Sequence, residues 1–207
     1  MRLRRALLRL FFRHLYTTLA WSYDAIAYLV SVGQWAAWVR AAVPAGTADP
    51  VLEIGHGPGH LLIELGGRAI GVDPSRQMSR LANRNLRRKE IEPRLVRARA
   101  QALPFRSASF GCLVSTFPAE FILEDRSIQE AWRVLRSGAS AVIVGNAQIR
   151  GRSLPDRFAA WLFRVTGQYA DLPPGWSEPF QRVGFQMARE NVALPRSDVI
   201  RIIASKP

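Results

Sequence analysis

The sequence predicts an α/β protein in which helices cover both faces of a mostly parallel β-sheet. From residue 51 onward, apolar segments rich in β-branched residues alternate with segments of helical periodicity. Apolar strands separated by helices are typical of a sheet that is buried on both faces. A stretch of different character precedes this pattern. We therefore expect an N-terminal helical extension over residues 1–46 and a main domain over residues 47–207.

Within the main domain, strands are expected at 50–54, 68–73, 94–98, 110–116 and 139–146, and helices at 60–65, 75–90, 125–138, 153–168 and within 176–185. Ser75 precedes its helix as an N-cap, and Gly138 would end its helix as a C-cap glycine. The last two segments, 186–195 and 197–206, are expected to be paired strands. Residues 21–43 are expected to be helical and carry several aromatic side chains.

Composition and charge narrow the class of protein. The 207 residues are 48% hydrophobic, which suits one domain with an extension and excludes general disorder. The one cysteine, Cys112, lies in an apolar segment, so buried packing is its expected role and a reducing compartment is consistent with it. The net charge of +13, carried by 27 arginines and two lysines, favours an anionic partner: nucleic acid, an acidic membrane surface or an anionic substrate.

No segment reads as a transmembrane span, because the longest candidate, residues 25–39, falls short of the ~20 apolar residues that a spanning helix needs. Residues 1–20 contain five arginines and no acid, and Arg2, Arg5, Arg9 and Arg13 would share one helical face. Such a helix could lie in a membrane interface, pack on the domain or serve as a targeting peptide. We expect a cytoplasmic protein for which contact with the inner face of the membrane is one option.

The first expected strand runs into a glycine-rich loop, in "VLEIGHGPGH". The dinucleotide fingerprint G-x-G-x-x-G would need a third glycine where His60 stands, and the phosphate loop would need a lysine that is absent. Glu53 precedes the glycines, and an acid there is a poor neighbour for phosphate but is acceptable beside a cation. The alternative is that the glycines serve only a tight strand-to-helix turn.

Asp73 ends the second expected strand, in "GVDPS". A carboxylate at this place can accept both hydroxyls of a ribose. Together with the glycine loop and Glu53, it suits a nucleoside that carries a positive charge and no phosphate. S-adenosylmethionine (SAM) is such a molecule.

Four stretches in this order, "VLEIGHGPGHLLIEL", "GVDPSRQM", "AQALPFRSASF" and "EAWRVLRSGASAVIV", resemble successive motifs of class I SAM-dependent methyltransferases. The variant is similar to the type 11 group, which includes the ubiquinone and menaquinone methyltransferases. The resemblance covers about residues 50–205. It implies a Rossmann-like sheet of seven strands with SAM across the carboxyl ends of the first strands.

The resemblance also implies roles for particular residues. Glu53 and the loop would contact the methionine part, Asp73 the ribose, and the segment after the fourth strand would face the reacting methyl group. The full set implied at the cofactor is Glu53, Gly55, His56, Gly57, Gly59, Asp73, Pro74, Ser75, Met78, Ala100, Gln101, Ser115, Thr116 and Phe117.

The extension resembles the quinone methyltransferases more weakly, through Tyr23, Asp24, Ser31, Gly33 and Trp38 at the spacing of a segment that caps the active site. Ordinary packing of aromatic helices is the alternative. We name no catalytic base; the weak candidates are His14, Tyr23 and Asp24, with His56 and His60 placed in the cofactor loop. No grouping of residues predicts a metal site.

Three places depart from the family pattern. One is "RVLRSGA", which stands where the family has "RVLKPGG". Arg99 stands where the family has an acid that accepts from the adenine amino group, and an arginine cannot accept a hydrogen bond. Either Arg99 turns outward and backbone atoms recognise the adenine, or affinity is reduced. Gly111 replaces the usual aspartate of the "SFD" run.

The expected function is methyl transfer to a small lipophilic acceptor, quinone-like or a lipid. The alternatives are an RNA or other nucleic-acid methyltransferase and a SAM-binding relative without turnover. The nucleic-acid alternative is motivated by Arg76, Arg80, Arg84 and Arg88, which are spaced by four along one expected helix. Against it, "STFP" follows the fourth strand in place of the N/D-P-P-Y/F/W run of nucleobase-amine methyltransferases.

Overall fold

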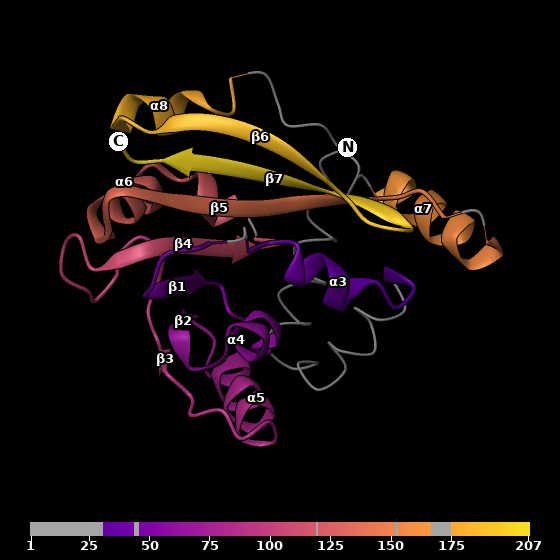
Figure 1. Ribbon diagram of the computed structural model, residues 1–207, viewed down its shortest axis with the longest axis horizontal. Helices are drawn as coiled ribbons and strands as arrows, with labels where there is room; N and C mark the ends of the chain where they lie inside the picture. Colours follow the sequence, from indigo (N-terminus) through magenta and orange to yellow (C-terminus); the bar gives the residue numbers. More distant parts are fainter. Residues whose placement is uncertain (1–30, 44–45, 119, 152, 167–174) are drawn as a thin grey trace.

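The computed structural model describes residues 31–43, 46–118, 120–151, 153–166 and 175–207. Its centre is one seven-stranded sheet with strand order β3-β2-β1-β4-β5-β7-β6 (Figure 1). The strands are β1 (Val51–Ile54), β2 (Ala69–Val72), β3 (Leu95–Val96), β4 (Phe110–Thr116), β5 (Leu135–Ile149), β6 (Gln186–Ala193) and β7 (Ser197–Ser205). The first five run parallel, whereas β7 pairs antiparallel with both β5 and β6. The predicted fold class and the predicted pairing of the last two strands are confirmed.

The helices connect and cover these strands. They are α3 (Trp35–Arg40), α4 (His60–Leu65), α5 (Arg76–Arg87), α6 (Asp125–Val134), α7 (Leu154–Thr166) and α8 (Glu178–Val183), with short 3-10 turns η2 (Gly66–Arg68) and η3 (Glu120–Leu123). Each helix of the main domain lies where its apolar periodicity predicts it. The exposed arginines of α5 face away from buried Met78, Ala82 and Leu86.

Alternating side chains of the central strands divide the core into two apolar clusters. On β1, Val51 joins the cluster under α3, α4 and α5, and its neighbour Leu52 joins the cluster under α6 and α8. Cys112 and Leu113 of β4 divide in the same way. This two-sided burial is the physical reason for the continuous apolar composition of the strands.

Two expected elements have different bounds in the structure. The helix expected over 125–138 ends at Val134, and β5 begins at once with Leu135, which pairs with Phe110 of β4. Gly138 therefore lies inside β5 with φ +77° and is not a C-cap glycine. A single helix over 21–43 is also wrong where the chain is described, because Val32 and Gly33 have positive φ and break it before α3.

Residues 31–43, the part of the N-terminal extension that the structure describes, pack against the main domain. Trp38 of α3 has no exposed surface, and its Nε1 donates a hydrogen bond of 2.8 Å to Ser197 Oγ at the start of β7. Arg40 of the same helix pairs with Glu64 of α4 at 3.1 Å. Through these contacts α3 forms part of the same apolar cluster as β1 and α4.

Candidate cofactor site at the carboxyl edge of the sheet

The loop between β1 and α4 has a conformation that requires glycine. Gly55 and Gly59 have φ of +78° and +85°, a region that side-chain-bearing residues rarely adopt. A Cβ on Gly59 would also lie 3.1 Å from Ala82 Cβ of α5. The amide of Asn85 on α5 donates to Pro58 O at 3.1 Å. The loop is thus held against α5.

Asp73 lies at the end of β2 with 8% of its surface exposed. Its Oδ2 accepts from Gly57 N at 3.1 Å, and its Oδ1 accepts from Ser75 N at 2.8 Å. Ser75 Oγ accepts from Met78 N at 3.2 Å, which confirms Ser75 as the N-cap of α5. One carboxylate therefore joins the glycine loop to the start of α5, and each of its oxygens keeps a further lone pair for a ligand.

Glu53 is 1% exposed and lies within β1, between the apolar residues Leu52 and Ile54. Its Oε2 has no hydrogen-bond partner among the described residues. Burial, and then the nearby charge of Asp73, raise the pKa of the Glu53 carboxyl well above 4.5. A buried carboxylate without a partner is costly. This position therefore favours a ligand that brings a positive charge or a hydrogen-bond donor.

His56 lies inside the loop and is also buried. Its Nδ1 is 2.8 Å from Gly57 O, while its Nε2 has no partner among the described residues. Burial lowers the pKa of His56 despite the opposing effect of Asp73, so the ring is neutral near pH 7. A Cβ on Gly71 of β2 would lie 3.0 Å from His56 Cδ2, which shows that the ring fills the space that Gly71 leaves. The His56 ring thus packs between the glycine loop and Gly71 of β2.

Three predicted residues end β4. Ser115 is fully buried, and its Oγ donates to Ile54 O at 2.7 Å, so its side chain joins β4 to β1. Thr116 is partly exposed. Phe117 has φ +47°, and its ring centroid lies 4.7 Å from that of Trp35 and 5.9 Å from that of Trp38. An aromatic wall contributed by α3 therefore borders this edge.

The segment after β3 forms the side predicted to hold adenine. Ala100 is buried, and Gln101 Nε2 donates to Glu124 Oε2 at 2.7 Å. Arg99 is exposed, which agrees with the alternative in which its side chain turns outward. Pro74 is exposed and Met78 is buried within the core side of α5.

Sequence reasoning missed two contributions from beyond β4. A Cβ on Gly55 would lie 3.4 Å from Cζ of Phe121 in η3, so this ring lies against the glycine loop. On α6, Arg133 donates to Leu103 O at 2.9 Å and to Phe105 O at 2.7 Å, while Glu130 accepts from Leu103 N at 2.7 Å. These contacts connect residues far apart in the chain, so neighbouring residues do not predict them. Only the "LPF" part of the motif was visible in the sequence.

The remaining predicted positions lie away from this edge. Gly111 stands near the start of β4, where a Cβ would lie 2.7 Å from Ala48 O. The aspartate of the family pattern is thus excluded by close approach of the backbone, at the end of the strand opposite the loop. Burial raises the pKa of Cys112 to about 12, so this thiol stays protonated and packs in the core.

Several predicted residues cannot be placed. His14, Tyr23 and Asp24 lie outside the described residues, as does the basic segment 1–20. Of the cap motif, Ser31 is buried and its Oγ accepts from Trp35 N at 3.1 Å. In the described part of the chain, no group of three His, Cys, Asp or Glu side chains could hold a metal ion. No helix described in the structure is long and apolar enough to cross a bilayer.

Comparison with known proteins agrees with this geometry. Residues 52–143 match the family model described as a methyltransferase domain, Methyltransf_11. The ubiquinone/menaquinone biosynthesis C-methyltransferase UbiE of Rhizobium etli is 27% identical over 173 residues, which cover 77% of this chain and 67% of the relative. The same enzyme of Agrobacterium fabrum is 26% identical over 173 residues, again 77% of this chain and 67% of the relative.

Solved structures share the fold. A putative SAM-dependent methyltransferase of Methanococcus maripaludis has a TM-score of 0.65 at 21% identity and covers 92% of this chain and 94% of its own. The geranyl diphosphate C-methyltransferase of Streptomyces coelicolor, solved with Mg²⁺, geranyl diphosphate and S-adenosyl-L-homocysteine, has a TM-score of 0.59 at 13% identity, covering 83% and 78%.

Sheet order, glycine loop and family match together define a class I SAM-dependent methyltransferase. The unpartnered Glu53 oxygen fits its cofactor, because SAM carries a positive charge and no phosphate. Within the class, residues 52–143 match the type 11 family model, and the chain is similar to the UbiE enzymes.

Proposed function

We propose that the chain transfers a methyl group from SAM to a small lipophilic acceptor, quinone-like or a lipid, at a membrane surface. The observation that carries this proposal is the apolar wall beside the glycine loop. Phe117 packs at a tilt against the tryptophans of α3, and Phe121 lies against Gly55. The names of the relatives support an acceptor of this class, since the UbiE enzymes belong to quinone biosynthesis and the Streptomyces enzyme was solved with geranyl diphosphate.

In this proposal the residues of the carboxyl edge hold the cofactor. Asp73, fixed by two backbone amides, accepts the ribose hydroxyls with its remaining lone pairs. Glu53 and the loop contact the cationic methionine part, and the segment around Ala100 and Gln101 borders the adenine. SAM supplies an electrophilic methyl group, and the protein contributes alignment of the acceptor for an in-line displacement. A general base is needed only where the acceptor arrives protonated.

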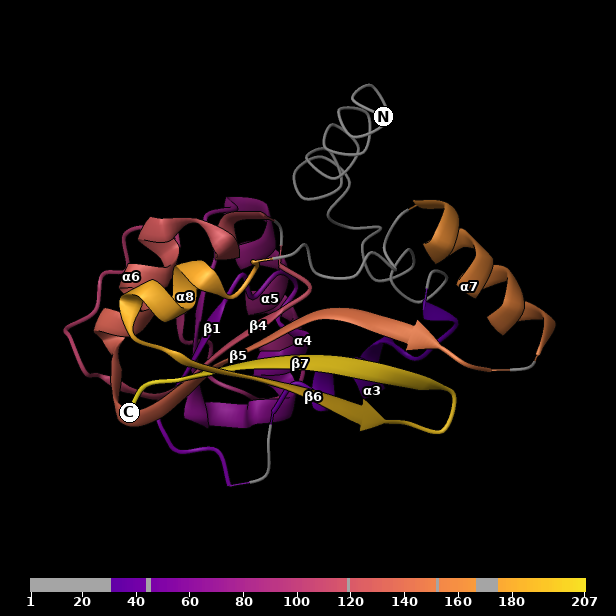
Figure 2. The same cartoon turned by 90° about the horizontal axis from the view of Figure 1, so that it is seen from above.

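An exposed apolar face supports delivery of the acceptor from a membrane. Leu154, Phe158 and Trp161 of α7 have 78%, 64% and 51% of their surfaces exposed and recur at helical spacing on one side. Arg157 is exposed beside them, and the chain carries a net charge of +13. An apolar stripe flanked by positive charge suits an anionic lipid surface. Figure 2 shows α7 beyond the end of β5, apart from the other labelled helices.

The acceptor class is tested by incubating the purified chain with radiolabelled SAM and either a membrane lipid extract or total RNA. We expect label in the lipid fraction. The variant Asp73→Ala provides the control, because loss of the ribose contacts should abolish SAM binding and all labelling. Label that enters RNA and leaves the lipid fraction unlabelled would contradict the proposal.

A further inference from the structure

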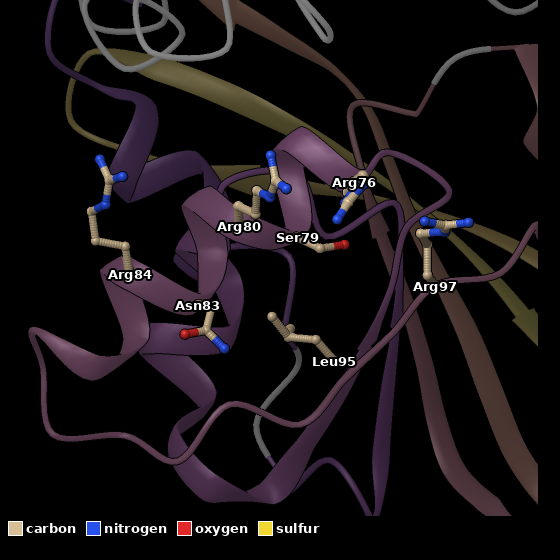
Figure 3. A pocket seen from close by; sticks show the side chains of 7 residues that line it. All are labelled: Arg76, Ser79, Arg80, Asn83, Arg84, Leu95 and Arg97. Atoms are coloured by element: carbon tan, nitrogen blue, oxygen red, sulfur yellow. The ribbon is translucent and has the colours of Figure 1, made fainter.

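A second pocket lies outside the cofactor site, between α5 and the edge strand β3 (Figure 3). Four arginines line it: Arg76, Arg80 and Arg84 on successive turns of α5, and Arg97 just after β3. Its volume is about 560 Å³, within the range of small-molecule sites. Figure 3 shows these side chains along α5 and beside β3; Arg84 lies at the left of the view and points away from Arg97.

The charge of this pocket is uncompensated by the described protein. None of the four arginines forms an ion pair with a described residue, and no carboxylate is among the lining side chains. Like charges four residues apart on a helix repel and lower its stability. A ligand of opposite charge would relieve this repulsion.

Apart from Ser79, the polar groups of the pocket are suited to donate hydrogen bonds. Asn83 Oδ1 accepts from Arg87 Nε at 3.0 Å, which leaves the amide NH₂ of Asn83 as a donor. Ser79 uses its hydroxyl proton on Ser75 O at 3.0 Å. Guanidinium groups add planar, paired N–H donors that match phosphate oxygens. The pocket therefore favours a ligand rich in acceptor oxygens.

We propose that this pocket binds a small ligand carrying two phosphate groups, a diphosphate or bisphosphate. A phosphate monoester carries a charge of about −1.5 to −2 near pH 7, so a bisphosphate carries about −3 to −4, and a diphosphate somewhat less, against the four arginines. None of the residues that line this pocket belongs to the set predicted to contact SAM, and SAM carries no phosphate.

The lining argues for a compact phosphate ligand over a nucleic-acid strand. Proteins that bind single strands combine positive charge with aromatic side chains on which bases stack. No aromatic residue lines this pocket; Leu95 is its one apolar side chain. A small ligand can instead be contacted from both elements.

Titration of the full-length chain with inorganic pyrophosphate, without SAM, tests the proposal by calorimetry. We expect saturable one-site binding and a rise in melting temperature on ligand addition. The double variant Arg80→Gln/Arg97→Gln should weaken pyrophosphate binding by about tenfold or more, because charge-assisted bonds are lost from two elements. Its affinity for SAM should match the wild type, which shows that the fold and the cofactor site are intact.

The matched control is Arg88→Gln, an exposed arginine of the same region that does not line the pocket. It should change pyrophosphate affinity by less than about twofold, since long-range charge is screened by salt. Equal losses in both variants, or absence of saturable binding, would overturn the proposal. So would tighter binding of an RNA oligonucleotide than of pyrophosphate with the same arginine dependence.

The source of the phosphates is found by competition. Displacement of pyrophosphate from the wild type by vesicles that contain cardiolipin, but not by vesicles of phosphate-free lipid, would assign the pocket to a lipid headgroup. Retained pyrophosphate in the presence of these vesicles would assign it to a soluble phosphate ester. Both results require the pocket to bind phosphate and support the proposal.

Discussion

Glu53 combines complete burial with an oxygen that no described residue satisfies. Desolvation and the charge of Asp73 raise the pKa of its carboxyl. In the cofactor-free protein, this raised pKa means that the charged form is destabilised by folding. The carboxyl therefore does not lower the free energy of unfolding below its unfolded pKa of about 4.5. It lowers this free energy increasingly as pH rises from there through the higher folded pKa.

We predict that Glu53→Gln raises the melting temperature of the cofactor-free protein at pH 7 and weakens SAM binding by about tenfold or more. The substitution removes a buried charge while it also removes the partner of the cofactor cation. For a chain of this size, about 1 kcal/mol corresponds to roughly 2–4 °C. Thermal unfolding and calorimetry measure the two effects, with exposed Glu92→Gln as the neutral control. A lower melting temperature together with unchanged SAM affinity would refute both halves.

Residues with a local signal were predictable from the sequence. The loop glycines, Asp73 and the N-cap Ser75 are specified by neighbours within a few positions, and the structure places them together. Phe121 and Arg133 were missed because their contacts connect η3 and α6 to segments 28 or more residues away. Gly111 could not be explained from its neighbours in the sequence, because the backbone that excludes a larger residue there belongs to Ala48.

At the scale of elements, α6 fixes the segment that follows β3. Arg133 binds two carbonyl oxygens of residues 103–105, and Glu130 binds the Leu103 amide. The two side chains also bind each other, at 2.6 Å between Arg133 Nε and Glu130 Oε1. A segment without regular secondary structure thereby obtains partners for its backbone.

We predict that Arg133→Gln destabilises the fold by about 1–3 kcal/mol at pH 7, a range that allows for the partial exposure of this arginine. Hydrogen bonding to Arg133 is the main cause of the lowered pKa of Glu130. The pair therefore stabilises the fold above the unfolded pKa of glutamate, and this contribution is lost as pH falls through the folded value. Urea unfolding at pH 7 and pH 3 should show a smaller difference between variant and wild type at pH 3.

The control for this measurement is Arg182→Gln. Arg182 forms an exposed pair with Asp125 at 3.5 Å, which should contribute little. Comparable destabilisation by both substitutions would contradict a special role for Arg133.

Element boundaries were harder to predict than element types. The run "VLRSG" continues the helical pattern of α6, yet Leu135 is taken into β5 by pairing with Phe110. Periodicity within a few residues cannot report a partner on another strand, so the end of this helix is set by the sheet. Conversely, β4 matched its predicted bounds because both flanks change composition sharply.

At the scale of the whole molecule, strand order brings the carboxyl ends of β1, β2 and β4 to one edge. The β-branched composition of the strands predicted a parallel sheet, and the resemblance implied seven strands, but the strand order was not predicted. The exposed stripe of α7 could not be predicted as exposed from its sequence, because an apolar helical face is equally suited to burial.

We predict that Phe158→Ser/Trp161→Ser weakens binding to anionic vesicles by about tenfold or more, since each aromatic side chain contributes about 1.5–3 kcal/mol when removed from water. Co-sedimentation with vesicles measures the effect, and calorimetry with SAM confirms that the cofactor site is unchanged. Vesicle binding equal to that of the wild type would show that another surface, such as residues 1–30, makes the contact. Gel filtration of the same variant would then reveal whether a second copy covers α7.

The packing of Phe117 against Trp35 and Trp38 has an optical consequence. Indole emission depends on the polarity and packing around the ring, and here two indoles border the edge where methyl transfer is proposed. Trp38 is fully enclosed and Trp35 partly so. A ligand that displaces Phe117 changes the surroundings of both rings at once. The protein thus carries its own fluorescent probe, and acceptors of unknown identity can be screened in solution without any label.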